Sequence, residues 1–350
     1  FEALESVAGK AVDVLVLDHH QTGSALPSAY ALVNPNRQDD LSAQGHLCAA
    51  GVVFLTLVAV SRELRRRGRA TSQLPNLLDD LDLVALATVC DVVPLVGLNR
   101  AFVVKGLVVM RELKKPGLRA LAELTRLSGP VDTFHLGFLL GPRINAGGRI
   151  GEAALGSRLL MTLDDFEARG LAEQLHELNT ERQTMEKSML EDAEAEARAE
   201  IGGGTGPHVL IVGRTDWHPG IVGLIASRLK ERFNRPAFAI SFDASGRGTG
   251  SGRSVSGFDI GAFVRSAVEQ GVLLKGGGHA MAAGLTVRRD NLAHFRSLAE
   301  ESVGTKGRNS IGDHLLPIDA ALSARGLTLS LHEMVDRAGP YGAGHLAPTF

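Results

Sequence analysis

The 350-residue chain has little cysteine and almost no net charge. Its two cysteines, Cys48 and Cys90, lie in apolar, helix-like patterns. This predicts two small buried residues and no disulfide framework, which fits a reducing cytoplasm. A formal net charge of −2 excludes a strongly basic protein. Any binding of nucleic acid must therefore come from local clusters of donors.

The chain also lacks a long hydrophobic run and a secretory signal. Its most apolar segment, residues 47–60, is shorter than the ~20 residues that a membrane-spanning helix needs. Residues 1–10 have no basic start followed by an apolar core. The sequence therefore predicts no membrane association. It starts at Phe1 without Met and stops at Phe350 without a closing element, so we expect both ends to be cuts.

The pattern of helical, strand-like and glycine-rich segments predicts two α/β domains joined by a long helix. Residues 164–200 are rich in Glu, Arg, Ala and Gln, and their apolar positions are too sparse to bury a full face. This is typical of a solvated helix that bridges two domains. A glycine-rich break follows at 202–207. We predict a parallel-sheet domain at 1–163, a connecting helix and linker at 164–206, a smaller α/β domain at 207–304, and the start of a further module at 313–350.

An apolar run at Val14–Leu17 stops abruptly at Asp18-His19-His20. The run predicts a central strand of a parallel sheet, buried on both faces, whose carboxyl end opens into a ligand crevice. Neighbouring side chains at a strand end diverge, so the triplet cannot chelate one ion alone. The alternative is a helix-capping aspartate followed by two surface histidines.

Asp91 is the first partner that the sequence suggests for the triplet. It follows an apolar helical segment, where an acid is costly unless it is paired or bound to a metal. A helix-end cap or a salt-bridged acid is the alternative. Histidine with carboxylates and without thiolate favours Mn²⁺ or Mg²⁺. A site for two metal ions needs more acids than Asp18 and Asp91 supply.

The composition of residues 141–149 predicts a glycine-rich turn that carries Arg143, Asn145 and Arg149. Backbone amides freed by its glycines, together with two guanidinium groups, would suit a phosphate. The alternative is a structural turn whose arginines pair with helix carboxylates.

Three elements of the second domain are rich in donors that suit a phosphate. His218 precedes a helix expected to start at Pro219, where the helix dipole favours an anion. Ser251 and Arg253 lie in a glycine-rich hairpin or strand at 246–253. Residues 276–279, Gly-Gly-Gly-His, precede a strand and allow a close backbone approach. Each element alone is weak evidence, because glycine-rich loops are more often turns than ligand sites, but the three together indicate phosphate binding.

These motifs resemble a known family. Asp18-His19-His20 is similar to the signature of the DHH phosphoesterases, and residues 276–284 are similar to that of the DHH-associated substrate-binding domain. Within the family, residues 217–228, 250–254 and 340–345 resemble the single-strand-specific DNA exonucleases; the last segment resembles the start of an oligonucleotide-binding (OB-fold) barrel. The resemblance implies a two-domain α/β fold, with a parallel-sheet catalytic domain, a long connecting helix, a smaller α/β domain and the start of that barrel.

The resemblance also implies roles for individual residues. His19 and Asp91 would be metal ligands for Mn²⁺ or Mg²⁺. His20 would contact the scissile phosphate or assist proton transfer, and Asp18 would orient its neighbours. The residues that would bind the DNA backbone or its 5′ phosphate are Arg143, Asn145, Arg149, His218, Ser251, Arg253, Gly277, Gly278 and His279.

The implied function is 5′-to-3′ hydrolysis of single-stranded DNA to 5′ mononucleotides in repair and recombination. A helicase and a single-strand-binding protein are candidate partners. The family has further acidic motifs ahead of the DHH strand, which would fall before Phe1, so we expect residues 1–350 alone to bind metal poorly and to be inactive. Two alternatives stay open. One is a phosphodiesterase for short oligonucleotides or cyclic dinucleotides, and the other is an inactive DNA-binding scaffold.

Overall fold

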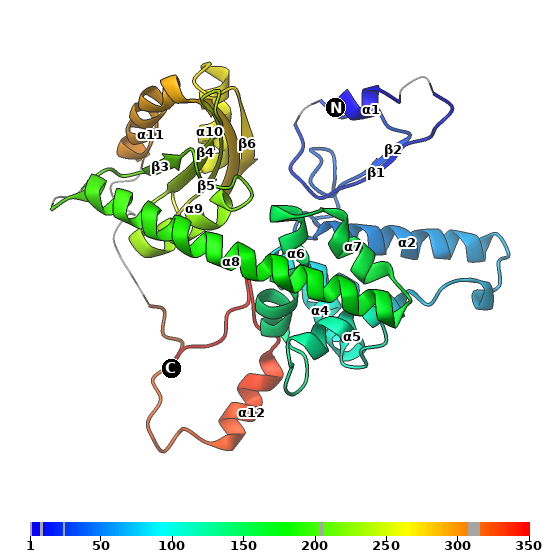
Figure 1. Cartoon of the computed structure of the whole chain (residues 1–350). Helices are drawn as coiled ribbons and strands as arrows, with labels where there is room; N and C mark the ends of the chain where they lie inside the picture. The colour runs from blue at the N-terminus through cyan, green and yellow to red at the C-terminus, as the bar shows by residue number, and fades with distance from the viewer. Residues whose placement is uncertain (1, 8–9, 24, 204–205, 307–315) are drawn as a thin grey trace. The chain divides into compact units, whose positions relative to one another are not determined.

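The computed structural model describes residues 2–7, 10–23, 25–203, 206–306 and 316–350 (Figure 1). The chain forms two compact units. Unit 1 consists of residues 1–144, 157–173 and 316–350, and unit 2 of residues 145–156 and 174–315. The domain boundaries at 163, 206 and 304 stay predictions. Parts of both predicted linkers, at 204–205 and 307–315, lie outside the described residues, as does the start of the module predicted at 313.

Unit 1 is mainly helical and contains one small sheet. Its elements are α1 (Glu2–Glu5), β1 (Leu15–Leu17), β2 (Ala31–Val33), α2 (Ala49–Arg66), the 3₁₀ helices η1 (Thr71–Gln73) and η2 (Leu77–Asp80), α3 (Leu81–Cys90), α4 (Gly97–Met110), α5 (Pro116–Leu124), the π-helix η3 (His135–Leu140), α7 (Ala154–Met161) and α12 (Leu329–Ala338). Its core includes an edge-to-face pair, Phe54 from α2 and Phe102 from α4, whose ring centroids lie 5.3 Å apart. Through these contacts α2, α3 and α4 share one hydrophobic core.

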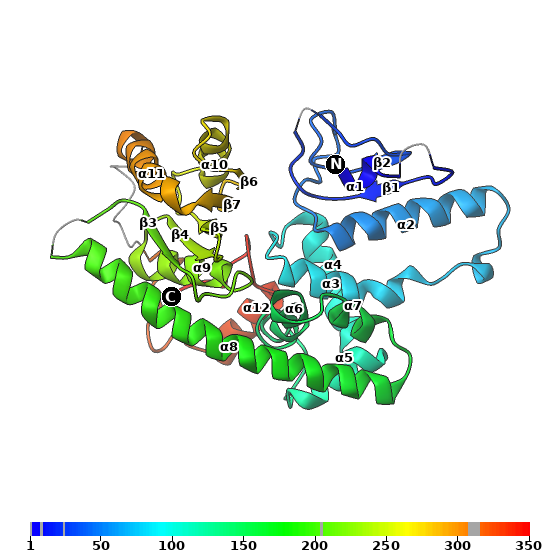
Figure 2. The ribbon, with the colours of Figure 1, turned by 45° about the horizontal axis from the view of Figure 1, so that its top comes forward.

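The segment before Asp18 is a strand, as predicted, but the prediction that this strand is buried is wrong. β1 pairs in parallel with β2, with Leu15 opposite Ala31, and the two strands lie over the amino-terminal part of α2 (Figure 2). Leu15 is 63% exposed, so β1 is not buried on both faces. Among the described residues β2 is the sole strand that pairs with it. An apolar run predicts a strand, but it gives no information on which other segments pack against that strand.

The predicted glycine-rich turn at 141–149 is instead helix α6 (Gly141–Ile150), which continues directly from η3. Glycine costs roughly 1 kcal/mol in a helix interior, but tertiary packing can override that preference. A Cβ atom on Gly141 would lie 2.4 Å from the Sγ of Cys90, so glycine permits the close approach of the two segments. The amides of this segment therefore belong to a helix rather than to a phosphate-binding turn.

The predicted long helix is α8 (Asp165–Ile201), 37 residues long and visible as the long green helix in Figure 1. Its amino-terminal residues belong to unit 1 and the rest to unit 2. Within unit 2, Met189, Ala193 and Ala197 of α8 are buried against the sheet and α9, while most other side chains of this stretch are polar. The sparse apolar positions are those that pack.

Unit 2 is built on a five-stranded mixed sheet in the order β3-β4-β5-β7-β6. Its further elements are β3 (Leu210–Arg214), α9 (Val222–Phe233), β4 (Ala237–Phe242), β5 (Arg247–Arg253), α10 (Ile260–Glu269), β6 (Lys275–His279), β7 (Ala282–Arg288), the 3₁₀ helix η4 (Arg289–Asn291) and α11 (Leu292–Lys306). β3 and β4 are parallel, and the other pairs are antiparallel.

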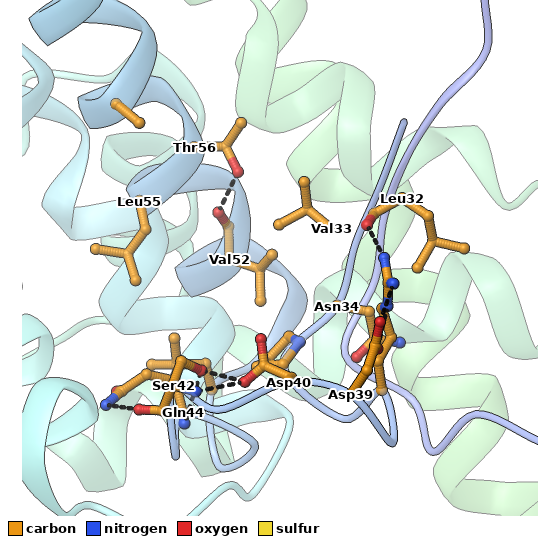
Figure 3. A pocket seen from close by; sticks show the side chains of 14 residues that line it. Leu32, Val33, Asn34, Asp39, Asp40, Ser42, Gln44, Val52, Leu55 and Thr56 are labelled. Carbon is orange, nitrogen blue, oxygen red and sulfur yellow. Dashed lines mark hydrogen bonds and ion pairs between the residues drawn. The ribbon is translucent and has the colours of Figure 1, made fainter. Parts of the chain in front are cut away.

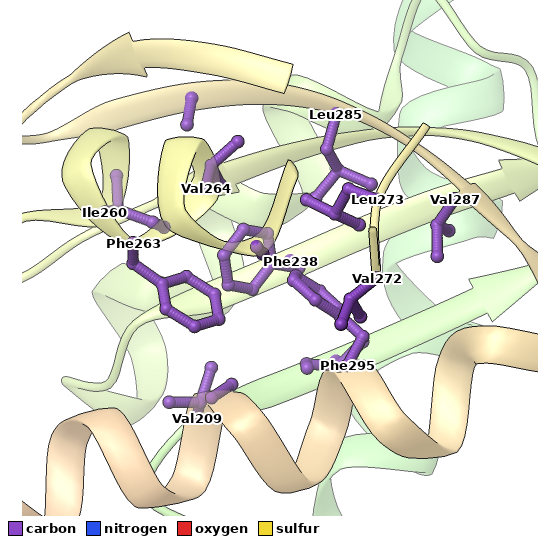
Figure 4. Packing of buried hydrophobic residues seen from close by; sticks show 14 of the residues in the cluster. Val209, Phe238, Ile260, Phe263, Val264, Val272, Leu273, Leu285, Val287 and Phe295 are labelled. Carbon is purple, nitrogen blue, oxygen red and sulfur yellow. The ribbon is translucent and has the colours of Figure 1, made fainter. Parts of the chain in front are cut away.

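Alternating side chains of β4 point to the two opposite faces of this sheet. Phe238 points toward α10 and α11, where it packs with Phe263 and Phe295 (Figure 4). Ala237 and Ala239 face the other way, toward α9 and α8. Side chains of a strand alternate between faces with a period of two. The same period determines which predicted site residues of β5 and β6 share a face.

Two local predictions in unit 2 need correction. Residues 276–279 precede the predicted strand, now β7, but they are themselves a strand, the edge strand β6, rather than a glycine-rich loop. Helix α9 does not start at Pro219; it starts at Val222, after a turn at 219–221. Residues 246–253, predicted as a hairpin or strand, form strand β5 from Arg247.

The end of the chain packs in unit 1. The segment predicted to begin a barrel contains the helix α12 and an isolated bridge between Gly342 and His345. Arg100 donates hydrogen bonds to the carbonyl oxygens of Ala338, Gly339 and Pro340. No described helix is long and apolar enough to cross a membrane.

Candidate metal centre and nucleic-acid interface

The Asp18-His19-His20 triplet lies at the carboxyl end of the parallel pair β1 and β2. The Asp18 amide still donates to the carbonyl of Val33 at 3.0 Å, which extends the ladder to the first residue of the triplet. The carboxyl ends of parallel strands are where α/β proteins place ligands. The polar residues therefore start where the strand ends, as the sequence predicted.

A hydrogen bond made by its ring nitrogen Nδ1 orients the His19 side chain. Its Nδ1 lies 3.1 Å from the carbonyl oxygen of Leu47, and because a carbonyl can only accept, Nδ1 carries the proton. Nε2 therefore keeps its lone pair in the neutral ring, which is the form that binds metals. Nε2 lies 3.6 Å from Oδ2 of Asp91. This distance is long for a hydrogen bond, whereas two ligands of one cation, each about 2.1 Å from it, lie roughly 3–4 Å apart.

Asp91 was predicted to be buried, and the structure contradicts this. It occupies the C-cap of α3, and its side chain is 43% exposed, compared with 18% for His19. The buried face of α3 lies earlier in the helix and includes Val84 and Leu86, whereas the residue after Asp91, Val92, is 71% exposed. The alternative of a helix-end residue is thus correct for its position, and the predicted proximity to the triplet also holds.

His20 and Asp18 form a second pair beside the first. Nδ1 of His20 lies 2.7 Å from Oδ1 of Asp18, which also accepts from the backbone amides of His19 and His20. Partial burial of the Asp18 carboxyl raises its pKa, but these hydrogen bonds outweigh burial and hold the pKa below its ordinary value. The His20 side chain is 68% exposed, so it can meet a substrate from solvent.

The described residues contain no cluster of three or more His, Cys, Asp or Glu that could hold a metal ion. His19 and Asp91 thus form a pair rather than a complete ligand set. The pair fits a hard divalent cation in its chemistry, one imidazole nitrogen and one carboxylate oxygen with no thiolate.

Sequence reasoning missed the loop that holds the triplet. This loop is the Asn34-Pro35-Asn36 segment after β2. Asn34 is buried and donates from Nδ2 to the carbonyl of His20 at 2.8 Å. Asn36 donates from Nδ2 to the carbonyl of His19 at 2.6 Å. The signal available in the sequence was an Asn-rich turn directly after a strand, since such side chains often bind nearby backbone.

A cavity of about 580 Å³ lies in unit 1 between β2 and α2 (Figure 3). Leu32 and Val33 line it from β2, and Leu55 and Thr56 from α2, while Asp39 and Asp40 belong to the loop after β2. None of the predicted site residues lines it. It is therefore not the candidate metal centre itself, although Asn34 and Leu47, which bind His20 and His19, also line it.

In unit 2, several predicted phosphate-binding residues converge at the amino-terminal end of α9. A Cβ atom on Gly223, in the first turn of α9, would lie 3.3 Å from Oγ of Ser251 and 3.4 Å from Nη2 of Arg253. Nη1 of Arg253 donates to Ser251 Oγ at 2.8 Å. Glycine at 223 thus brings the hydroxyl and the guanidinium group against the end of a helix, where anions are favoured.

Arg149 and His218 complete this cluster. Arg149 donates to the carbonyl of Gly220 at 3.3 Å, and Gly220 in turn donates to Nδ1 of His218 at 3.1 Å. Burial lowers the pKa of Arg149 and that of Arg253, and the positive charge of Arg149 lowers the pKa of Arg253 further. Two half-buried guanidinium groups that repel each other would gain from a bound anion.

Register places Gly277 and His279 on the same face as Ser251 and Arg253. Ser251 is opposite Gly284, which is opposite Gly277; Arg253 is opposite Ala282, which is opposite His279. A Cβ atom on Gly277 or on Gly284 would meet nothing within 4 Å, so this face is open. Its floor is backbone, which permits a ligand to lie flat against it.

Gly278 does not share that face. It alternates with Gly277, and a Cβ atom on it would lie 2.3 Å from the carbonyl oxygen of Ala282. Gly278 therefore has a packing role rather than an open approach to a ligand. Two other predicted residues remain outside the cluster. Arg143, in unit 1, donates to the carbonyl of Leu139, and Asn145, in unit 2, is exposed.

Comparison with known proteins identifies the family. The model of the DHHA1 domain matches residues 206–305. The single-stranded-DNA-specific exonuclease RecJ of Dickeya dadantii is 39% identical over 97% of this chain and 61% of its own length. A crystal structure of exonuclease RecJ bound to manganese is 34% identical, with a TM-score of 0.65 over 87% of this chain and 72% of that one. The chain belongs to the RecJ family.

Membership of the RecJ family confirms the resemblance of the DHH triplet and the predicted α/β fold class. The RecJ structure from Thermus thermophilus in complex with Mn²⁺ has a TM-score of 0.84 at 32% identity and covers 99% of this chain. It is much longer, since this chain covers 49% of it. The chain thus spans between 49% and 72% of the length of these RecJ proteins, and 61% of the curated relative from Dickeya dadantii.

Proposed function

We propose that the complete gene product containing this chain is a metal-dependent 5′-to-3′ exonuclease that hydrolyses single-stranded DNA to 5′ mononucleotides in repair and recombination. Its RecJ relatives are named single-stranded-DNA-specific exonucleases at 34–39% identity. The observation that carries the proposal is the pair formed by His19 Nε2 and Asp91 Oδ2 at 3.6 Å, at the end of the DHH strand.

His19 and Asp91 would hold Mn²⁺ or Mg²⁺, the ions in the RecJ structures from Thermus thermophilus. Such an ion would stabilise charge that develops on the phosphate during hydrolysis. The hydrogen bond from His19 Nδ1 to Leu47 would leave Nε2 free to bind such an ion. A second metal ion stays a prediction, because the described residues supply only this pair.

The remaining residues would bind and orient the substrate. His20 is exposed and can contact the scissile phosphate or move a proton at Nε2, while its Nδ1 is fixed by Asp18. In unit 2, Ser251, Arg253 and Arg149 would bind the 5′ phosphate at the end of α9. Gly277 and His279 would flank the strand along the open face of the sheet. Roles for Arg143 and Asn145 in holding the DNA backbone stay predictions.

Degradation of labelled single strands by the complete gene product tests this proposal. We expect Mn²⁺-dependent release of 5′ mononucleotides from long single strands, with little degradation of the matching blunt duplex. Preference for di- to pentanucleotides or cyclic dinucleotides would favour the phosphodiesterase alternative. Binding of single strands without hydrolysis at any Mn²⁺ or Mg²⁺ concentration would favour the scaffold.

A cytoplasmic location is part of the same proposal. Both cysteines are free thiols in the structure, as in proteins of reducing compartments. A helicase and a single-strand-binding protein as partners stay predictions from the family.

A further inference from the structure

Three consecutive backbone carbonyl groups precede α2, at Gly45, His46 and Leu47. Each accepts a hydrogen bond from a different side chain. Nδ2 of Asn36 donates to Gly45 at 2.9 Å, Nδ2 of Asn99 donates to His46 at 2.7 Å, and Nδ1 of His19 donates to Leu47 at 3.1 Å. We call residues 45–47 the carbonyl segment. It anchors side chains from three separate parts of unit 1.

Asn36 connects the carbonyl segment to the backbone of His19. The same Nδ2 that binds Gly45 also donates to the carbonyl of His19 at 2.6 Å, and Oδ1 accepts from Nε2 of Gln21 at 3.0 Å. A Cβ atom on Gly45 would lie 2.5 Å from Oδ1 of Asn36, so the amide can approach this closely only because residue 45 is glycine. The backbone and the ring of His19 are therefore both held to the carbonyl segment.

Asn99 connects the carbonyl segment to the turn that carries Asp91. It is fully buried near the start of α4, and its Nδ2 donates both to His46 and, at 2.9 Å, to the carbonyl of Pro94. Pro94 lies in the short connection from Asp91 to α4. Loss of this amide would leave two carbonyl groups without that donor, which costs free energy in a buried place.

We propose that Asn36 and Asn99 are positioning residues that set the separation of His19 Nε2 and Asp91 Oδ2. Asn36 fixes one ligand to the carbonyl segment, and Asn99 fixes the turn of the other ligand to the same segment. Asn36 binds His19 through its backbone carbonyl, and Asn99 binds the turn after Asp91, so both act at the backbone and not at Nε2 or Oδ2. The inference rests on the proposed function, since it assigns both asparagines to the affinity of that site for a divalent cation. Groups that orient metal ligands typically contribute about 10–100-fold to affinity.

The test is the Mn²⁺ affinity of the complete gene product, measured by electron paramagnetic resonance of unbound Mn²⁺, which needs no catalysis. The variants are Asn36→Ala and Asn99→Ala. Asn76→Ala is the matched control, because Asn76 is exposed in the same unit and donates to Asp79 within its own turn at 3.0 Å. We expect the dissociation constant to rise about tenfold or more in the two variants and to stay unchanged in the control.

Two further readouts separate positioning from general destabilisation. First, exonuclease activity of Asn36→Ala should recover toward the wild-type level at saturating Mn²⁺, because the chemistry is intact once the cation is bound. Second, the double variant should lose less affinity than the sum of the single losses, because both residues act through the carbonyl segment. Where Asn99→Ala does not fold, Asn99→Ser, which keeps one donor, replaces it, and Asn36→Ala is decisive on its own.

Wild-type Mn²⁺ affinity in folded Asn36→Ala would overturn the proposal, and so would an equal loss in the Asn76→Ala control. A wild-type protein that degrades single strands and binds Mn²⁺, with variants that bind it equally well, would overturn this inference and leave the proposed function intact. A wild-type protein without affinity for Mn²⁺ or Mg²⁺ would overturn both.

Discussion

Nε2 of His19 and Oδ2 of Asp91 lie 3.6 Å apart, although one follows a strand and the other ends a helix. His19 is positioned by the parallel pair of β1 and β2, and Asp91 by the last turn of α3. The two atoms are too far apart for a strong hydrogen bond and suitably spaced for a shared cation. This spacing is what the proposed role of the two residues as metal ligands requires.

Replacing either member of the pair should remove metal binding. We expect His19→Ala and Asp91→Asn to weaken Mn²⁺ binding of the complete gene product by about 100-fold or more, since loss of a direct ligand exceeds the 10–100-fold typical of outer groups. Isothermal titration calorimetry measures the change. His332→Ala, an exposed histidine of α12, is the control. Retained affinity in either variant would refute the ligand assignment.

Residues 1–350 alone should bind Mn²⁺ weakly. The described residues offer one imidazole and one carboxylate, and no cluster of three or more potential ligands. A cation held by two protein ligands keeps most of its water shell, so we expect affinity at least about tenfold below that of the complete gene product. Side-by-side titration of the two proteins decides this. Robust Mn²⁺-dependent degradation of single-stranded DNA by residues 1–350 alone would contradict it.

The sequence predicted the members of the site better than their surroundings. Residue type alone suggested that Asp91 belongs with the DHH triplet, and the structure brings them together. Burial was predicted wrongly for both β1 and Asp91, because an apolar neighbourhood in sequence does not show which elements cover it in space. The role of Asn36 was also missed, because its partners at His19 and Gly45 come from other segments.

The two glycine-rich segments show why glycine alone does not predict local structure. In 141–149 it indicated a turn, but close packing of Gly141 on Cys90 makes it part of a helix. In residues 276–279 glycine indicated backbone that a ligand can approach closely. This fits Gly277 but not Gly278. The difference depends on the register of β6 with β7, which local composition does not contain.

Arg253→Ala should reduce the preference for a 5′-phosphorylated end. Arg253 lies with Ser251 at the amino-terminal end of α9, and a charge-assisted hydrogen bond contributes about 1.5–3 kcal/mol, or roughly 10–100-fold. The measurement is the ratio of degradation rates for 5′-phosphate and 5′-hydroxyl single strands. Arg232→Ala, on α9 but paired with Glu194, is the control and should keep the ratio. An unchanged ratio in Arg253→Ala would place the phosphate elsewhere.

Cys90 should react slowly with thiol reagents at pH 8. Burial, and to a smaller extent the negative charge of Asp91, raises the pKa of its thiol to about 11. Only about 0.1% of the thiol is then ionised at pH 8, and the thiolate is the reactive form. The rate of iodoacetamide labelling should rise with each step in pH toward 11. Cys48 is 1% exposed and should label only after unfolding. Rapid labelling of the native protein at pH 8, absent in Cys90→Ser, would contradict the raised pKa.

Gly278 should be far less tolerant of substitution than Gly277. Gly278 has φ of +156°, and a Cβ atom there would meet the Ala282 carbonyl at 2.3 Å, so Gly278→Ala should lower the free energy of unfolding by about 2 kcal/mol or more. Gly277 has open space instead, so Gly277→Ala should change it by less than about 0.5 kcal/mol. The larger Gly277→Val should weaken binding of single-stranded DNA, because its side chain would rise from the open face beside Gly284, on the strand next to that of Ser251. Urea unfolding and fluorescence anisotropy with a labelled oligonucleotide measure the two effects. Unchanged DNA affinity in a stably folded Gly277→Val variant would show that the strand does not cross this face.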